Sequence, residues 1–327
     1  MARRKKGRLV NGILVLDKPT GMSSNKALQQ VKRLFFAQKA GHTGSLDPLA
    51  TGVLPICLGE ATKVSHYLLD SNKSYRAKCI LGQVTTSGDS DGDIIGETPV
   101  PELLESDLLA ILADFEGPQE QTPPMFSALK HNGRPLYEYA RKGIVIERKS
   151  RPITLFSIKL LSYDLTKDSD KPFIEIEVRC SKGTYIRTLC EDIGTKIGCG
   201  AHIGALRRID SGPFLLSQAI TLDDLLTRFK PEEGLETIPE EQDYTAMDQL
   251  LLPTDTAIQN FPSIEINAAE FDKIQHGINI DFQPDSDLTK HSSDYRLYYN
   301  NILIALAIPV KNDNNEMQLK PKRLLFL

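Results

Sequence analysis

A single carboxylate held in a stiff turn is the strongest chemical feature of the sequence. Residues 41–52 read GHTGSLDPLATG, which surrounds Asp47 with glycines, a proline and hydroxyl residues. The proline disfavours helical geometry at Asp47, while Gly44 and Gly52 permit backbone conformations that a side chain would block. A loop this constrained holds a carboxylate in place for nucleophilic or base chemistry. Asp-Pro also forms purely structural turns, so the segment alone leaves both interpretations open.

Two further side chains lie on elements that would aim them at such a carboxylate. Alternation over residues 74–82 predicts a strand that carries Tyr75, either as a core aromatic or as a stacking surface for a base. Alternation over 173–180 predicts the clearest strand, and residues 185–197 have the apolar spacing of a helix that starts close to Arg187. A guanidinium beside a carboxylate favours the ionised form, although an ordinary structural ion pair uses the same residues.

The rest of the chain mixes strands and helices without a regular β-α-β alternation. Strands are predicted at 12–16, 144–148, 153–163, 264–266, 302–309 and 319–326. Helices are predicted after Ser23 or Ser24, over 61–69, after a cap at Ser106, over 136–142, and over 268–276 behind an Asn267–Glu270 capping box. Residues 40–59 are expected to form an ordered loop that leads into a strand. This mixture favours an α+β fold with a mixed sheet.

Charge is segregated along the chain. The net charge of −4 argues against polyanion binding over the whole surface, yet residues 1–8 carry five Lys/Arg and no acid. Residues 125–151 carry seven Lys/Arg against two acids, whereas residues 231–248 carry seven acids and no base. Such segregation lets an acidic protein present a basic face to phosphates, although each run alone is also typical of a solvated surface.

These composition shifts also predict the domain organisation. The basic, proline-containing segment at about 123–151 is expected to leave the core as an exposed excursion. The acidic stretch 231–248 is the natural boundary between a larger domain, residues 1–250, and a smaller, mostly β domain, residues 251–327. Two domains also fit the length of 327 residues.

Several classes of protein are excluded. No run of about 18 uncharged apolar residues is present, so no membrane span is expected. Asp17 and Lys18 interrupt the first apolar stretch, which argues against a signal peptide. Five cysteines without a CxxC motif argue against a disulfide framework or a zinc site and favour a reducing cytoplasm. The loop at 41–52 lacks the Gly-Lys-Ser/Thr of a nucleotide-binding P-loop.

Read at full length, residues 41–63 resemble the central motif of the TruB family of tRNA pseudouridine synthases. Other segments resemble further motifs of the same family: Gly12–Gly21 with Leu16-Asp17-Lys18-Pro19, Lys73-Ser74-Tyr75, Cys180–Leu189 and Gly200–Arg208. The resemblance covers roughly residues 10–215 with high specificity and is weak after residue 250.

The resemblance implies a fold and a set of site residues. The fold would be a mixed, mainly antiparallel central sheet with flanking helices, followed by a small, mostly β, PUA-like RNA-binding domain. Asp47 would be the catalytic aspartate, Tyr75 would pack against the target base, and Arg187 would pair with the aspartate. Positions that contact the RNA or the flipped nucleotide in the family are matched by His42, Tyr185 and Leu206.

The resemblance also implies an activity: isomerisation of uridine-55 in the T-loop of tRNA to pseudouridine, in the cytoplasm. The reaction gains and loses no group, so neither a cofactor nor a metal is expected. The target base has to be flipped out of its stack. We expect tRNA as the partner, no obligate protein partner and a monomer. Whether Asp47 attacks C6, attacks C1′ or triggers loss of a C2′ proton stays open.

Two rival functions use the same residues. An RNA-binding scaffold would keep the fold without the chemistry, but both Asp47 and Arg187 are present. A glycosidase-like hydrolase would need a second carboxylate as its general acid. Asp17 is a formal candidate for that acid, although its Lys-Pro neighbours fit the family's first motif better.

Overall fold

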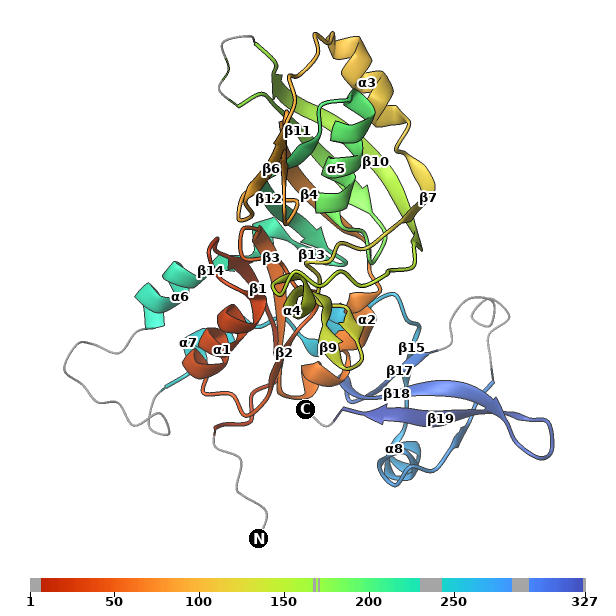
Figure 1. Cartoon of the computed structure of the whole chain (residues 1–327). Coiled ribbons are helices and arrows are strands. Elements are labelled where there is room, and N and C mark those ends of the chain that lie inside the picture. Colours follow the sequence, from red (N-terminus) through yellow and green to blue (C-terminus); the bar gives the residue numbers. More distant parts are fainter. Residues whose placement is uncertain (1–6, 167–168, 170, 230–242, 284–293, 326–327) are drawn as a thin grey trace.

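Two large β-sheets, the helices packed on them and two short two-stranded sheets make up the described part of the chain (Figure 1). The computed structural model describes residues 7–166, 169, 171–229, 243–283 and 294–325. The larger sheet belongs to the first two thirds of the chain, and the smaller, five-stranded sheet lies towards the C-terminus.

The larger sheet is mixed and mainly antiparallel. Its main path runs in the order β14 (Ile220–Thr221), β1 (Gly12–Lys18), β3 (Thr51–Leu58), β12 (Ala201–Ser211), β4 (Lys73–Leu81), β11 (Phe173–Cys180), β10 (Arg151–Asp164) and β7 (Gly117–Gln121). Two short strands pair beside this path, β2 (Ala40–His42) with β3 and β13 (Phe214–Leu215) with β12. Only the β1–β14 and β3–β12 pairs are parallel. The predicted α+β fold is therefore confirmed.

The main core lies between this sheet and its helices. Helix α5 (Ile186–Ile197) packs on β12 and β4, α3 (Glu105–Ala113) packs on β10, and α1 (Ser24–Leu34) packs on β2 and β3. Ser23 caps α1 by accepting a hydrogen bond from the Lys26 amide, at 3.2 Å. Gly198 ends α5 at φ 97°, a left-handed conformation that favours glycine. Further helices are α2 (Ser65–Leu69), α6 (Leu222–Phe229) and α7 (Thr245–Asp248).

Strand β1 is buried on both faces, which explains its unbroken apolar run. Leu14 and Leu16 point into the main core, whereas Ile13 and Val15 point into a second core. That second core also contains Leu303 and Leu306 of the C-terminal sheet, so it joins the two sheets. Burial on both sides fixes β1, and with it the start of the chain segment that leads to α1.

The C-terminal sheet has the strand order β15 (Ser263–Glu265), β17 (Tyr295–Tyr299), β18 (Ile302–Lys311), β19 (Met317–Leu324) and β16 (Ile280–Asp281). Helix α8 (Ala268–Gln275) packs against it over a small core of its own. The predicted Asn267–Glu270 capping box is present, with reciprocal hydrogen bonds of 2.9 and 3.0 Å. This mostly β unit agrees with the expected PUA-like domain.

The basic excursion contains only short elements. They are β8 (Lys130–His131), β9 (Arg134–Pro135) and α4 (Leu136–Ala140), and they lie in front of the larger sheet in Figure 1. The strand predicted at 144–148 is wrong, because this segment forms no regular structure and exposes Ile144 and Val145. Alternation alone names no partner strand, and none of the described strands pairs with this segment.

Several other local predictions need correction. Helix α3 begins at Glu105, before the predicted cap at Ser106, and the Leu104 amide donates to Asp107 Oδ2 at 2.8 Å. The helix predicted over 61–69 is split into a 3₁₀ helix, Gly59–Lys63, and α2. Most of the predicted acidic boundary at 231–248, namely residues 231–242, lies outside the described residues. A further hairpin, β5 (Gln83–Thr85) with β6 (Ile94–Glu97), has no counterpart among the predictions.

Candidate active site

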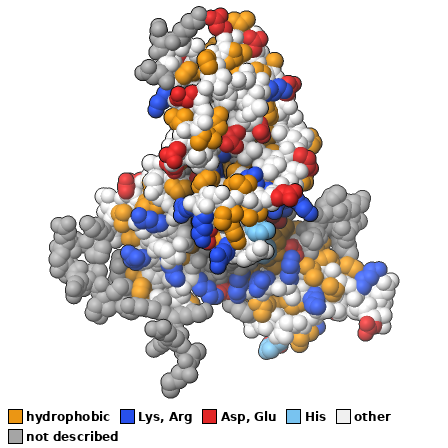
Figure 2. All heavy atoms as spheres, viewed as in Figure 1, with side chains coloured by type: hydrophobic (Ala, Val, Ile, Leu, Met, Phe, Trp, Pro, Cys, Tyr) orange, Lys and Arg blue, Asp and Glu red, His pale blue; other side chains and the backbone are white. Residues whose placement is uncertain are grey.

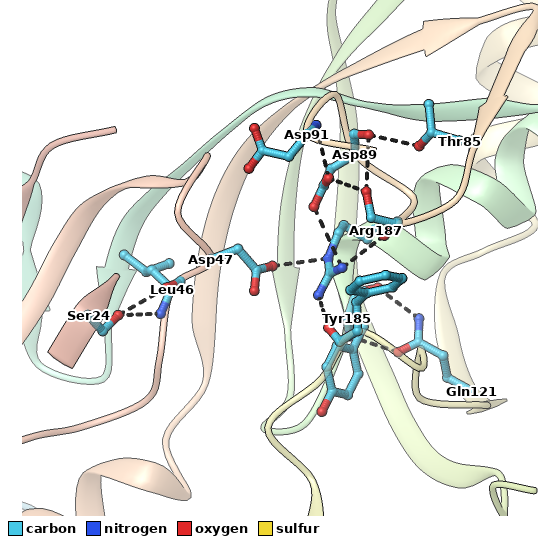
Figure 3. A network of polar contacts seen from close by, with 11 residues as sticks. Ser24, Leu46, Asp47, Thr85, Asp89, Asp91, Gln121, Tyr185 and Arg187 are labelled. Carbon is cyan, nitrogen blue, oxygen red and sulfur yellow. Dashed lines mark hydrogen bonds and ion pairs between the residues drawn. The ribbon is translucent and has the colours of Figure 1, made fainter. Parts of the chain in front are cut away.

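Asp47 and Arg187 meet although 140 positions separate them in the chain (Figure 3). Asp47 Oδ2 lies 3.0 Å from Arg187 Nε, and the two side chains point towards each other. The Arg187 side chain is only 5% exposed, whereas that of Asp47 is 41% exposed. The pair therefore has a buried cation and an anion that a ligand can reach.

Arg187 is held by more than Asp47. Its Nη1 donates to the carbonyl oxygen of Ser87 at 2.9 Å, and its Nη2 donates to that of Phe126 at 2.6 Å. Nη1 also lies 3.6 Å from Oδ2 of Asp89, a buried carboxylate that approaches the guanidinium from another direction than Asp47 does (Figure 3). A planar guanidinium with several donors suits such a site better than an ammonium group does. These contacts fix the plane that faces Asp47.

The turn that carries Asp47 is braced by the segment between β1 and α1. Ser24 Oγ accepts a hydrogen bond from the Leu46 amide at 2.7 Å and donates to the Leu46 carbonyl oxygen at 3.1 Å. Gly21 donates its amide to the carbonyl oxygen of Pro48, at 2.8 Å. Both neighbours of Asp47 are thus tied to the start of α1 or to the loop that precedes it. The predicted rigid turn is consistent with these bonds.

Lys18 adds a buried cation beneath the same turn. Its Nζ donates to the carbonyl oxygens of Pro19 at 2.8 Å and Met22 at 2.6 Å. Burial lowers the pKa of Lys18 to about 8, while Asp47 acts in the opposite direction. Lys18 therefore supplies positive potential near the carboxylate as well as local bracing.

The pKa of Asp47 is higher than that of an ordinary aspartate. The surrounding protein removes water from the carboxylate and so raises its pKa, even though 41% of the side chain is exposed, and Arg187 opposes this effect without cancelling it. The nearby negative charge of Asp89 raises the pKa further. The expectation that the arginine favours the ionised carboxylate is right in direction, but burial is the larger effect in the protein alone.

Tyr75 and Leu206 lie beside each other on neighbouring strands of the main core. Tyr75 is 8% exposed on β4. Leu206 is 8% exposed on β12, where it pairs with Ala77 of β4. Burial raises the pKa of the Tyr75 hydroxyl, and the charge of Asp47 acts in the same direction. Tyr75 is thus a buried aromatic, and it lies within electrostatic reach of Asp47.

Tyr185 and His42 complete the set of predicted site residues. Tyr185 lies just before α5, where its backbone amide and carbonyl both bond the side chain of Gln121, at 2.8 and 3.1 Å. Burial raises the pKa of its hydroxyl, with Arg187 and Asp47 as charged neighbours. His42 is on β2, and its buried Nδ1 has no hydrogen-bond partner among the described residues. Burial lowers the pKa of His42, and the charge of Arg208 adds to this effect.

Asp89 and Arg208 contribute to the site without having been singled out by their residue types. Asp89 lies in the segment SGDSDGD, which reads only as a polar turn. Arg208 follows Arg207 on β12, and charge alone does not distinguish the two. In the structure Arg208 is 1% exposed, whereas Arg207 forms a part-exposed ion pair with Asp17 at 2.6 Å. That pair also occupies the second carboxylate considered for a hydrolase.

Positive side chains gather around the excursion and over the C-terminal sheet. Figure 2 shows Lys and Arg across the lower half of the molecule, whereas most visible acidic side chains lie on the upper lobe. The exposed basic residues of the excursion are Lys130, Arg134, Arg141, Lys142, Lys149 and Arg151. On β19 the exposed ones are Lys320, Lys322 and Arg323. Among the described helices, none is long and apolar enough to cross a membrane.

Comparison with known proteins gives matches over nearly the whole chain. Residues 32–186 match the family model for the N-terminal domain of TruB family pseudouridylate synthases, and residues 187–259 match that for the C-terminal domain of tRNA pseudouridylate synthase B. The tRNA pseudouridine synthase B of Vibrio atlanticus is 50% identical over 280 residues, which cover 86% of this chain and 85% of the relative. That of Chromohalobacter salexigens is 47% identical over 325 residues, 99% of this chain and 97% of the relative.

Solved structures share the fold. A chain in the crystal structure of a Cbf5-Nop10-Gar1 complex aligns with a TM-score of 0.67 and 25% identity, covering 96% of this chain and 85% of that one. A chain in the crystal structure of the archaeal box H/ACA sRNP Nop10-Cbf5 complex aligns with a TM-score of 0.66 and 24% identity, covering 100% of this chain and 93% of that one.

The mixed sheet and its C-terminal β domain, together with these matches, define a pseudouridine synthase, which is an isomerase. Within that class, the chain belongs to the TruB family.

Proposed function

We propose that the enzyme converts uridine-55 in the T-loop of tRNA to pseudouridine in the cytoplasm, with Asp47 as the reacting group. The observation that supports this most is the contact of 3.0 Å between the reachable carboxylate of Asp47 and the buried guanidinium of Arg187. The relatives named above act on tRNA according to their names, and their similarity covers 86% and 99% of this chain.

The chemistry asks for one ionised carboxylate. The N1–C1′ bond breaks, the uracil turns, C5 joins C1′, and the proton on C5 moves to solvent while N1 takes one up. The atoms of uridine and pseudouridine are therefore the same. Asp47 begins this sequence by attack on the base or the sugar, or by removal of a sugar proton. Arg187 favours the anion that each route requires when the RNA has displaced water.

Base flipping brings the uridine to Asp47. A base stacked in the loop hides its glycosidic bond, and extruding it costs a few kcal/mol that the protein offsets with contacts elsewhere. Tyr75 offers an aromatic face, and base–aromatic stacking contributes about 1–3 kcal/mol. Tyr185 and Leu206 enclose the base, and His42 occupies the space that the base leaves or meets the backbone. The hydroxyl of Tyr75 relays the C5 proton.

The RNA is gripped away from the chemistry. The excursion at 123–151 presents exposed Lys and Arg, which suit the phosphates of a folded RNA. A division into a catalytic domain, residues 1–250, and a PUA-like RNA-binding domain, residues 251–327, fits the second basic surface on β19. We propose that the enzyme acts as a monomer without an obligate protein partner.

The test is to incubate the purified enzyme with unmodified tRNA transcript and to map pseudouridine at single-nucleotide resolution. We expect one modified position, uridine-55, and no product with Asp47→Asn. Asp70→Asn is a matched control, because Asp70 forms an exposed ion pair with Lys182, at 2.8 Å, and has no role in the proposed reaction. Product at full rate from Asp47→Asn would contradict the assignment of Asp47. Free uracil and an abasic site in place of pseudouridine would instead reveal a hydrolase.

A further inference from the structure

Arg208 is a charged side chain buried in the core without a carboxylate partner. It is 1% exposed and is the largest of the fully buried side chains among the described residues. No acidic residue in the described part of the chain forms an ion pair with it, whereas its neighbour Arg207 pairs with Asp17. Burying an unpaired cation is costly, and an apolar side chain of similar size would fill the same space more cheaply. The charge at this position therefore calls for an explanation other than stability.

The guanidinium of Arg208 ties together the two ends of the turn that carries Asp47. Its Nε donates to the carbonyl oxygen of Val53 at 2.7 Å, and its Nη2 donates to that of Gly44 at 3.2 Å. Gly44 precedes Asp47 and Val53 follows it, so one rigid group clamps the segment from both sides. Ser24 and Gly21 hold the middle of the same turn through their hydrogen bonds with Leu46 and Pro48.

The backbone of Arg208 lies between the Asp47 segment and the strand of Tyr75. On one side Arg208 pairs with Gly52 of β3, and on the other it pairs with Tyr75 of β4. Gly52 has φ +101°, and a Cβ there would lie 2.2 Å from the carbonyl oxygen of Arg208. The glycine thus allows β12 to approach the end of the Asp47 turn closely.

The side chain of Arg208 also acts on Tyr75. Both side chains are buried on the same face of the sheet, as their opposite positions on β12 and β4 require. Burial raises the pKa of the Tyr75 hydroxyl, and the positive charge of Arg208 is the largest influence that lowers it. One guanidinium therefore touches the Asp47 turn and electrostatically influences the phenol.

We propose that Arg208 is a positioning residue of the reaction, whose guanidinium sets the turn of Asp47 against the strand of Tyr75. This inference rests on the proposed function, because it assigns Asp47 and Tyr75 to one reaction. Arg208 acts through these two groups and not on the substrate. A reacting group misplaced by about 1 Å can cost on the order of a hundredfold in rate, so loss of the clamp should slow chemistry more than binding.

The test compares Arg208→Met and Arg208→Lys with Arg76→Met in single-turnover pseudouridine formation and in tRNA filter binding. Arg76 is a matched control, because it is next to Tyr75 on β4 and forms only a part-exposed pair with Glu177. We expect Arg208→Met to lower the single-turnover rate by about tenfold to a hundredfold while the tRNA Kd stays within about twofold. Arg208→Lys keeps the charge but not the fork, and should lie between Arg208→Met and the parent enzyme.

A double-mutant cycle with Tyr75→Phe separates positioning from general stability. If Arg208 acts through the phenol, Arg208→Met costs clearly less in the Tyr75→Phe enzyme than in the parent. Parental single-turnover rates in folded Arg208→Lys and Arg208→Met would overturn the proposal. Strictly additive losses in the cycle would overturn the part of it that runs through the phenol of Tyr75. If Arg208→Met does not fold, the Arg208→Lys rate and its cycle decide. A parent enzyme that forms no pseudouridine would refute the proposed function itself, before any comparison of the variants.

Discussion

Replacing Arg187 by methionine should destabilise the protein because it leaves a carboxylate buried without its cation. The Arg187 side chain contacts Asp89 at 3.6 Å and Asp47 at 3.0 Å. Asp89 is only 7% exposed, and breaking a buried ion pair by removing one partner costs about 3–5 kcal/mol. Asp47 is 41% exposed, so water replaces much of what it loses and its share is at most about 1 kcal/mol. The 3.6 Å separation from Asp89 places the expected loss at the lower end, about 3 kcal/mol.

The assay is urea denaturation followed by circular dichroism, with Arg76→Met as the control. Arg76 forms an exposed pair with Glu177, so its replacement should change the free energy of unfolding by less than about 0.5 kcal/mol. A second change, Asp89→Asn, removes the buried charge that Arg187→Met leaves behind. We expect the double variant to recover at least half of the lost stability.

The reasoning would be refuted if Arg187→Met unfolded at the same urea concentration as Arg76→Met. It would also fail if Asp89→Asn made the Arg187→Met variant less stable. Either result would show that Asp89 does not depend on Arg187 for its charge compensation in the folded protein.

Three further predictions follow from the same geometry. Folding raises the pKa of Asp47, so the ionised carboxylate opposes folding at every pH above the pKa of Asp47 in the folded protein. Asp47→Asn should therefore raise the melting temperature at pH 7, and this gain should vanish as the pH falls towards the ordinary carboxyl range. Tyr75→Phe should fold normally and bind tRNA. It should form pseudouridine at least about tenfold more slowly in a single-turnover assay, since general acid–base groups contribute about 10²–10⁴-fold. An unchanged rate would exclude the hydroxyl from the proton relay. Deleting residues 127–147 should weaken tRNA binding in filter assays and reduce its dependence on salt, because the exposed Lys and Arg of the excursion would no longer contact phosphates. Unchanged affinity would contradict an RNA-binding role of the excursion.

Periodicity predicted the elements whose pattern is strong and local. Strand β11 alternates between Ile174, Ile176, Val178 and Cys180 on the buried face and Glu175 to Arg179 on the other. Helix α5 has its apolar residues at helical spacing and a glycine stop. Such patterns state which face is buried, and the larger sheet needs only that to form its core.

Long β pairings were harder to predict. Strand β12 has no clean alternation, because Arg207 and Arg208 break it and bulges shift its register. Its partners β3 and β4 lie more than a hundred residues earlier in the chain, so only the folded protein brings them together. Strand β7 begins at Gly117 and contains Pro118, and it lies at the edge of the sheet, where a proline is tolerated.

The site shows the same division. The sequence around Asp47 predicts a rigid turn, because the glycines and the proline that restrict it are local features. Asp89 and Arg208 contribute to the site through contacts with distant segments. The residues next to them in the sequence do not indicate that their charges are buried. Tertiary packing determines which charges lie next to a buried group, and a single sequence does not show that packing.

The most direct test of the central claim is the position of the target uridine relative to residue 47. A crystal structure of Asp47→Asn bound to a T-stem-loop RNA would measure it. We predict a flipped uridine whose C1′ or C6 lies within about 3.5 Å of the residue 47 side chain, the distance of a near-attack geometry. A uridine that stays stacked in the RNA loop, with residue 47 well outside contact distance, would contradict the account.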